Sequence, residues 1–182
     1  MTGVQTCALP ISFIYNTDDK LPDVEQFVLD AGGVAIRGSA DFDDNGKFTG
    51  AKLSQFRLSP GDEMKADIVN GAEGLKINVR GAAIDARPFL QSFLGQSADM
   101  QALRDVDIDL KSAAITGHNK QALASAELRL VKRGGAMRQL ALNGRFGGDP
   151  ASATLVSEGG GAANYRIVSQ DAGAALSFLD LY

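Results

Sequence analysis

Most of the chain alternates apolar and polar residues with a period of two. In LKINVRG the apolar residues Leu75, Ile77 and Val79 fall on one side, and polar residues fall between them. DVDIDLK repeats this pattern with Val106, Ile108 and Leu110. Strict alternation is typical of a strand with one buried face in an antiparallel sheet. Weaker alternation follows in SAELRLVK, RQLALNGRF, SATLVSE and NYRIVSQ.

Turn signals separate these segments, which predicts consecutive hairpins. They are GHNK, KRGG, FGGDP and SEGGG. In the first half, VAIRGSADF and KFTGAKLSQFRL predict one hairpin across DDNG, and MKADIVNG and LKINVRG predict another. The predicted fold class is mainly β with a few short helices, built as an antiparallel meander.

Three segments break the strand rhythm and predict helices. IDARPFLQSFLG has a capping Asp85, a stop at Gly95 and an apolar stripe. QDAGAALSFLDLY has a capping Asp171 and a stripe of Ala175, Leu176 and Leu179. An early helix is predicted over Leu21 to Ala31, where Val24, Phe27 and Val28 form the stripe. The stripe of the first of these helices consists of Phe89, Leu90, Phe93 and Leu94.

The segments that begin at Asp85 and Asp171 share one layout: a strand, Asp-Ala, then a short apolar helix. We interpret this as a degenerate internal repeat of several strands and one helix, with units ending near residues 95 and 182. Two copies carry less weight than the three or more that are usual in repeat architectures.

The first eleven residues, MTGVQTCALPI, match the translation of a sequencing adapter and hold the only cysteine, Cys7. We expect residues 1–11 to be an artefact and set them aside. Residues 12–182 are then expected to be a fragment, truncated at both ends, of a longer protein. This remainder holds no thiol, so cysteine usage gives no redox compartment.

Charge argues against nucleic-acid binding, and the lengths of the apolar runs argue against a membrane-spanning segment in this sequence. With 18 basic and 22 acidic residues the net charge is −4, whereas nucleic-acid binding requires a basic surface. No apolar run approaches the ~20 residues that span a bilayer.

One acidic segment resembles a calcium loop. DFDDNGKFTGAK places Asp41, Asp43, Asn45 and Gly46 like the start of such a loop, but its twelfth position is Lys52 where a glutamate is needed. A polar hairpin turn, in which Asn45-Gly46 supplies positive φ, is the better interpretation.

The other candidates for chemistry are equally weak. His118 is the only histidine and is interpreted as part of a surface turn. The acidic row Asp105, Asp107 and Asp109 is interpreted as a solvated strand face, because no apolar surroundings would raise one pKa for acid catalysis. The Gly-rich SEGGGAAN precedes a strand, whereas a phosphate loop opens a helix. We therefore expect no enzyme, catalytic residue, metal site or cofactor.

The apolar face of the predicted strands must still be covered. Either the sheet closes into a sandwich or barrel, or it curls into a trough whose lining meets another molecule. Periodicity alone favours the closed sandwich.

A family resemblance favours the trough. VRGAAIDARPFL at 79–90, VDIDLKSAAITGHNKQALASAELRL at 106–130, LNGRFGG at 142–148 and YRIVSQDAGAALSFLDLY at 165–182 resemble the AsmA-like C-terminal region of YhdP-type envelope proteins of Gram-negative bacteria. The resemblance covers residues 56–182, more loosely from 21, and includes no catalytic motif.

The resemblance implies a curled, elongated periplasmic sheet with an apolar inner face, in a protein anchored in the inner membrane by a segment absent from this chain. It implies transport of phospholipid to the outer membrane and maintenance of that membrane, with acyl chains as the partner. The alternatives are a structural or adhesive secreted β-repeat protein and, less favoured, a carbohydrate-active enzyme. The candidate lipid contacts are Leu75, Ile77, Val79, Val106, Ile108, Leu110, Leu128 and Leu130.

Overall fold

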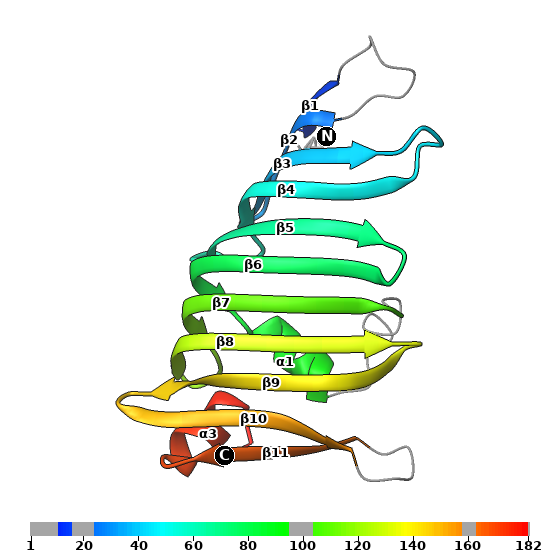
Figure 1. Cartoon of the computed structure of the whole chain (residues 1–182). Helices are drawn as coiled ribbons and strands as arrows, with labels where there is room; N and C mark the ends of the chain where they lie inside the picture. The colour runs from blue at the N-terminus through cyan, green and yellow to red at the C-terminus, as the bar shows by residue number, and fades with distance from the viewer. Residues whose placement is uncertain (1–10, 16–23, 95–103, 158–162, 182) are drawn as a thin grey trace, which may run out of the picture.

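A computed structural model describes residues 11–15, 24–94, 104–157 and 163–181. Eleven strands form one sheet whose spatial order is the order of the sequence (Figure 1). The strands are β1 (Ile11–Tyr15), β2 (Val24–Ala31), β3 (Val34–Phe42), β4 (Phe48–Arg57), β5 (Glu63–Gly71), β6 (Gly74–Asp85), β7 (Val106–Thr116), β8 (Ala122–Arg133), β9 (Ala136–Phe146), β10 (Asp149–Ser157) and β11 (Ala163–Ser169). The helices are α1 (Arg87–Leu94) and α3 (Ala172–Phe178).

The predicted fold class is confirmed: the protein is mainly β, and the sheet is open. The strand order runs from β1 to β11 without returning to β1, so the closed sandwich that periodicity alone favours is wrong. Both predicted hairpins of the first half are present, as β3–β4 and β5–β6.

One junction departs from the antiparallel meander. β6 and β7 run parallel, while every other neighbouring pair is antiparallel. α1 follows β6, and β7 then starts at the same end of the sheet as β6 because Leu75 pairs with Val106. Alternation within each strand could not reveal this, because it reports the buried face and not the strand direction.

The order of elements repeats. Six of the described strands, β1 to β6, precede α1, and five strands, β7 to β11, precede α3. Each Asp-Ala segment thus joins a strand to a helix, and the repeat inferred from them stays an interpretation. The expected boundary near residue 95 lies outside the described residues.

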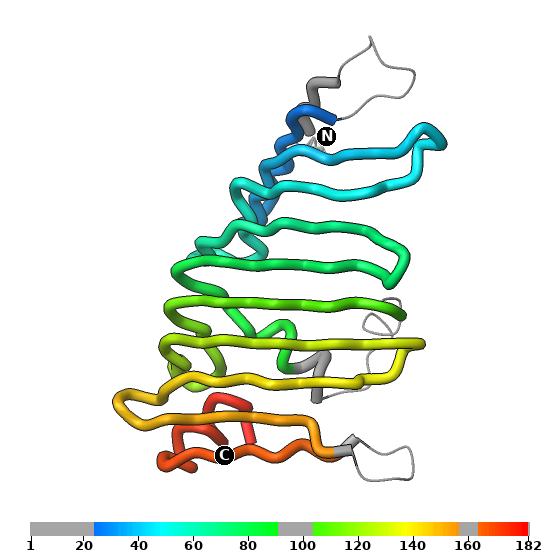
Figure 2. The backbone as a smooth tube through the Cα atoms, viewed as in Figure 1, coloured from blue at the N-terminus to red at the C-terminus, as the bar shows by residue number. Residues whose placement is uncertain are grey.

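Bulges interrupt the pairing of several neighbouring strands, most of them beside small residues. Register shifts occur next to Gly38 between β3 and β4, and next to Met64 between β5 and β6, where Gly81 is its partner. Between β8 and β9 the shift lies next to Ser125, whose φ is +49°. Such bulges bend strands and increase their twist. Figure 2 shows that the last part of β6 turns back before it leads into α1.

A side chain would clash at two glycines near these bulges. A Cβ on Gly81 would lie 2.2 Å from the carbonyl oxygen of Glu63, and a Cβ on Gly144 would lie 2.5 Å from Leu123 Cγ. Glycine therefore allows neighbouring strands to approach closely there.

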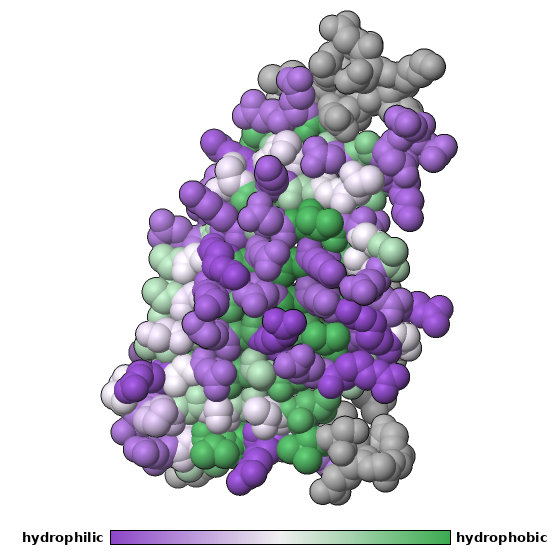
Figure 3. Space-filling view, in the orientation of Figure 1, coloured by the Kyte–Doolittle hydropathy of each residue, from purple (hydrophilic) through white to green (hydrophobic). Residues whose placement is uncertain are grey.

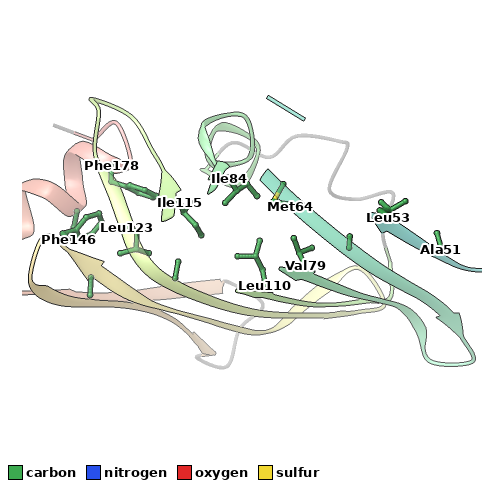
Figure 4. Packing of buried hydrophobic residues seen from close by; sticks show 14 residues of the cluster. Ala51, Leu53, Met64, Val79, Ile84, Leu110, Ile115, Leu123, Phe146 and Phe178 are labelled. Atoms are coloured by element: carbon green, nitrogen blue, oxygen red, sulfur yellow. The ribbon is translucent and has the colours of Figure 1, made fainter. Parts of the chain in front are cut away.

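Both helices pack against the apolar side of the sheet. Ala86 and Leu90 at α1, and Ala175 and Phe178 of α3, contact the main cluster of buried residues. In Figure 4 the labelled side chains of the strands, such as Val79 and Leu110, point to a common side of the sheet. The bend and the two helices cover part of this apolar side, on which Ile77, Ile108 and Leu128 remain half-buried.

The predicted early helix is wrong. Residues 24–31 form β2, which pairs with β3. A bulge between Val24 and Phe27 puts both residues opposite one side of β3, because Val24 pairs with Ala40 and Phe27 with Gly38. The extra residue produces a spacing of three that resembles a helical period.

The two later helices are present, with a corrected stripe in α3. Asp171 caps α3, since its Oδ1 accepts from the backbone N–H of Ala174 at 2.8 Å. Ala175 and Phe178 are its buried residues, whereas Leu176 is 41% exposed. In α1, Leu90 packs on the core and Phe89 is exposed, while Gly95 and the side chains of Phe93 and Leu94 lie outside the described residues.

Candidate apolar binding surface

One apolar row crosses eight strands of the sheet. Each residue of this row, which we call the central row, is the direct register partner of the next. Partners in register share a face of the sheet. The central row consists of Leu53, Ala66, Val79, Leu110, Leu128, Leu142, Ala153 and Ile167.

A second apolar row runs beside it on the same face. It crosses six strands through Ala51, Ile68, Ile77, Ile108, Leu130 and Leu140. Neighbouring strands lie ~4.8 Å apart, so the eight strands of the central row span roughly 34 Å. That is about twice the ~15 Å of one leaflet of a bilayer's hydrocarbon core. The surface is therefore long enough for an acyl chain to lie across several strands.

The structure brings all eight predicted contact residues to this face. Leu75 pairs with Val106, and the other six belong to the two rows. They differ in burial: Val79, Val106, Leu110 and Leu130 are buried, at 1–7% exposure, against their neighbours. Leu75, Ile77, Ile108 and Leu128 are half-buried. These four, not all eight, are the accessible part of the prediction.

The sequence prediction missed the end of the central row at the sheet edge. Ile167 is 49% exposed, and Tyr165, on the same face, is 42% exposed. The alternation in NYRIVSQ was the available signal, because it places both residues on the apolar side.

The opposite face carries charges arranged across the strands. Arg80 Nη2 lies 2.6 Å from Asp109 Oδ1, and its Nη1 donates to the carbonyl oxygen of Asp109 at 3.0 Å. Lys111 Nζ lies 3.0 Å from Glu127 Oε1. Figure 3 looks onto this face, where hydrophilic side chains predominate over the middle strands. The polar face is therefore solvated and cross-linked by ion pairs between strands.

The acidic row on β7 belongs to this polar face. Asp107 accepts a hydrogen bond from Arg133, and this bond holds the pKa of Asp107 below 3.8. Asp105 accepts from the backbone N–H of Gly134 at 2.7 Å. A general acid needs a raised pKa, so the direction at Asp107 is opposite to that of glycoside chemistry.

The loop that resembles a calcium site is a hairpin turn. Asp43 Oδ1 accepts from the backbone N–H groups of Asn45 and Lys47, both at 2.9 Å. Gly46, with φ of +74°, supplies the positive φ, and Asn45 does not. Within the described part of the chain, no group of three or more His, Cys, Asp or Glu side chains is placed to hold a metal ion.

His118 lies in a turn that packs against α3, so its interpretation as an ordinary surface turn is incomplete. Its backbone N–H donates to the carbonyl of Phe178 at 3.0 Å, and Asn119 Nδ2 donates to that of Ser177 at 3.1 Å. The imidazole is 16% exposed, and its Nδ1 lies 3.9 Å from Asp180 Oδ2. The β7–β8 turn thus caps the C-terminal end of α3.

Two open depressions lie on the polar face and not on the apolar one. One, of about 340 Å³, includes Arg80, Lys111 and Glu127 along the bend. The other, of about 630 Å³, includes Arg37, Lys52 and Lys65. Small residues such as Gly81 and Ala126 complete the first, and charged side chains make up half of the lining of the second. Neither α1 nor α3 is long and apolar enough to span a bilayer.

Comparison with protein-family models, with curated proteins and with solved structures finds no match to this chain. Its function is therefore inferred from the arrangement of its own residues.

Proposed function

We propose that the apolar face binds lipid acyl chains, and that the chain is the groove wall of an AsmA-like envelope protein that conducts phospholipid between the inner and outer membranes. The observation that carries the proposal is the central row, which stays apolar across eight strands of an open sheet. In this proposal the protein acts in the periplasm and catalyses no reaction.

The physical basis of binding is removal of methylene groups from water. Each buried methylene contributes ~0.8 kcal/mol. The half-buried Leu75, Ile77, Ile108 and Leu128 have apolar surface left to share with a chain laid across them. Because the contact is not directional, a chain can shift from one strand to the next without breaking hydrogen bonds. A continuous row is therefore suited to conduction as well as to binding.

The charged face explains why such a sheet stays in solution. Cross-strand pairs such as Arg80–Asp109 and Lys111–Glu127 keep the reverse side hydrated. In this proposal one face of the sheet contacts lipid and the other contacts water.

The test is lipid analysis of the purified chain. We expect phospholipid to co-purify after expression in a Gram-negative host and to be detected by mass spectrometry of an organic extract. Leu128→Glu places a charge in the middle of the central row, and we expect it to reduce the bound lipid several-fold. Thr154→Glu is the matched control, because Thr154 is exposed on the polar face of β10.

A second variant keeps the test valid if Leu128→Glu fails to fold. Ile167 is 49% exposed in the last strand, so Ile167→Glu tests the same face with little effect on folding. Far-ultraviolet circular dichroism establishes that each variant is folded. Folded wild-type protein without any lipid would contradict the proposal and favour the structural β-repeat alternative, which the recurrence of several strands followed by a helix also supports.

A further inference from the structure

The polar face is hollowed beside a bulge in β4. Against β3 the register shifts next to Arg37, which leaves Ser54 without a register partner on that strand. Against β5 the register shifts again, so that Ser54 and Gln55 both fall opposite the single residue Lys65. Bulges of this kind bend a strand and change the direction of its side chains. Ser54 is part of the lining of the open depression of about 630 Å³ on this face.

Three basic side chains from three adjacent strands line this depression. They are Arg37 of β3, Lys52 of β4 and Lys65 of β5, and all three are exposed. Within the part of the chain that the structure describes, none of the three forms an ion pair. Farther along the same face, Arg80 and Lys111 are each paired with a carboxylate of the next strand. The depression therefore holds cations whose charge no described carboxylate contacts.

The lining also includes two carboxylates, those of Glu25 and Asp67. Asp67 is the register partner of Lys52, so it lies one step along the strands from the bulge. At the bulge itself, Ser54 and Gln55 lie between Arg37 on one side and Lys65 on the other. Like charges on neighbouring strands repel each other, and an anion between them would replace this repulsion by attraction.

We propose that this depression binds a phosphate group, with Arg37, Lys52 and Lys65 as its cationic contacts. Ammonium and guanidinium groups donate charge-assisted hydrogen bonds to phosphate oxygens, and a guanidinium donates two in parallel. The phosphate is either free, or it is the ester of a small molecule or of a lipid headgroup. The depression lies on the polar face, so its occupation is independent of acyl chains on the apolar face.

The test is a titration of the whole ¹⁵N-labelled chain with inorganic phosphate near neutral pH, followed by amide chemical shifts at constant ionic strength. We expect saturable shifts confined to residues 37–39, 52–54 and 65–67. Arg37→Gln and Lys65→Gln should each weaken binding about twofold to fivefold, the range for solvated ion pairs. Asp67→Asn should tighten binding by a similar factor, because it removes a repelling charge.

Arg129→Gln is the matched control. Arg129 is exposed on the polar face of β8, opposite Asp109, and lies outside the depression, so its loss should leave phosphate binding unchanged.

Two soluble esters distinguish the sources of the phosphate. Glycerol 3-phosphate is a monoester that is largely doubly charged near neutral pH, whereas glycerophosphoglycerol carries the singly charged diester of a phospholipid headgroup. Binding of the diester as tight as that of phosphate would support a lipid headgroup as the ligand. Binding of phosphate and the monoester alone would support a small soluble phosphate.

Three results would overturn the proposal. They are the absence of saturable shifts, equal shifts on addition of sodium chloride in place of phosphate, and weakening by Arg129→Gln as large as that by Arg37→Gln. Each would show that the three cations act only as part of a general surface charge.

Discussion

Asp62 is a buried acid that joins the β4–β5 turn to the end of β6 through hydrogen bonds. It is 7% exposed and accepts three backbone hydrogen bonds. Its Oδ2 accepts from Leu58 and Ser59 at 3.0 and 2.8 Å, which closes the β4–β5 turn. Its Oδ1 accepts from Asp85 at 2.7 Å, where β6 leads into α1. We predict that Asp62→Ala destabilises this corner more than any exposed acid would.

The magnitude follows from the three donors that lose their acceptor. A hydrogen bond to a charged group contributes ~1.5–3 kcal/mol net. Leu58 and Ser59 are half-buried, so water can accept hydrogen bonds from their backbone N–H groups and offset part of the lost free energy. We expect a total of about 3 kcal/mol for Asp62→Ala. At ~2–4 °C per kcal/mol for a chain of this size, the melting temperature should fall by about 6–12 °C.

Urea unfolding followed by circular dichroism measures this change. Asp62→Asn keeps one acceptor oxygen, which can serve Leu58 and Ser59 but leaves Asp85 unpaired, so we expect about half the loss. Asp67 is exposed on β5, and Asp67→Ala is the matched control. We expect it to lower the free energy of unfolding by less than about 0.5 kcal/mol. A loss below about 1 kcal/mol for Asp62→Ala would refute the reasoning.

Three further predictions concern the bend, the helix cover and the acid range. Gly81→Val should cost more than about 2 kcal/mol in urea unfolding, because its Cβ would lie 2.2 Å from a carbonyl oxygen of β5; wild-type stability would contradict the close approach at the bend. Phe178→Ala should cost about 3–5 kcal/mol, since the ring is 4% exposed and packs edge-on against Phe146 at 5.5 Å; proteolysis near α3 should increase in parallel. Hydrogen bonds from Arg87 lower the pKa of Asp85 from 3.8, so the stability that this pair contributes is present above pH 3.8 and lost as the pH falls below it. Asp85→Asn should therefore be less stable than the wild type near neutral pH, and the difference should shrink in acid; a difference independent of pH would argue against the pair.

The strands and the apolar face were predictable because both depend on local alternation. Leu75, Ile77 and Val79 could be assigned to one side from the sequence alone, and their partners on β7 share that side. The turns were predictable for a similar reason, since glycine occupies positions with positive φ such as Gly46 and Gly74. Local pattern decides these features because one face of each strand is buried.

The features that depend on pairing were not predictable. The bulge in β2 shifted the apolar spacing toward that of a helix. The parallel junction of β6 and β7 and the three-way bonding of Asp62 join segments that the sequence separates. The degree of burial was not predictable either: Val106 is 1% exposed, while Ile108, two residues along the same strand, is half-buried.

Photo-crosslinking with a phospholipid that carries a diazirine on its acyl chain tests the central claim most directly. After irradiation of the lipid-loaded chain, digestion and mass spectrometry locate the modified residues. We predict crosslinks on the half-buried residues of the apolar face, above all Ile77, Ile108 and Leu128, and none on their exposed polar-face neighbours Asn78 and Arg129. Crosslinks spread equally over both faces, or confined to the polar face, would contradict the account.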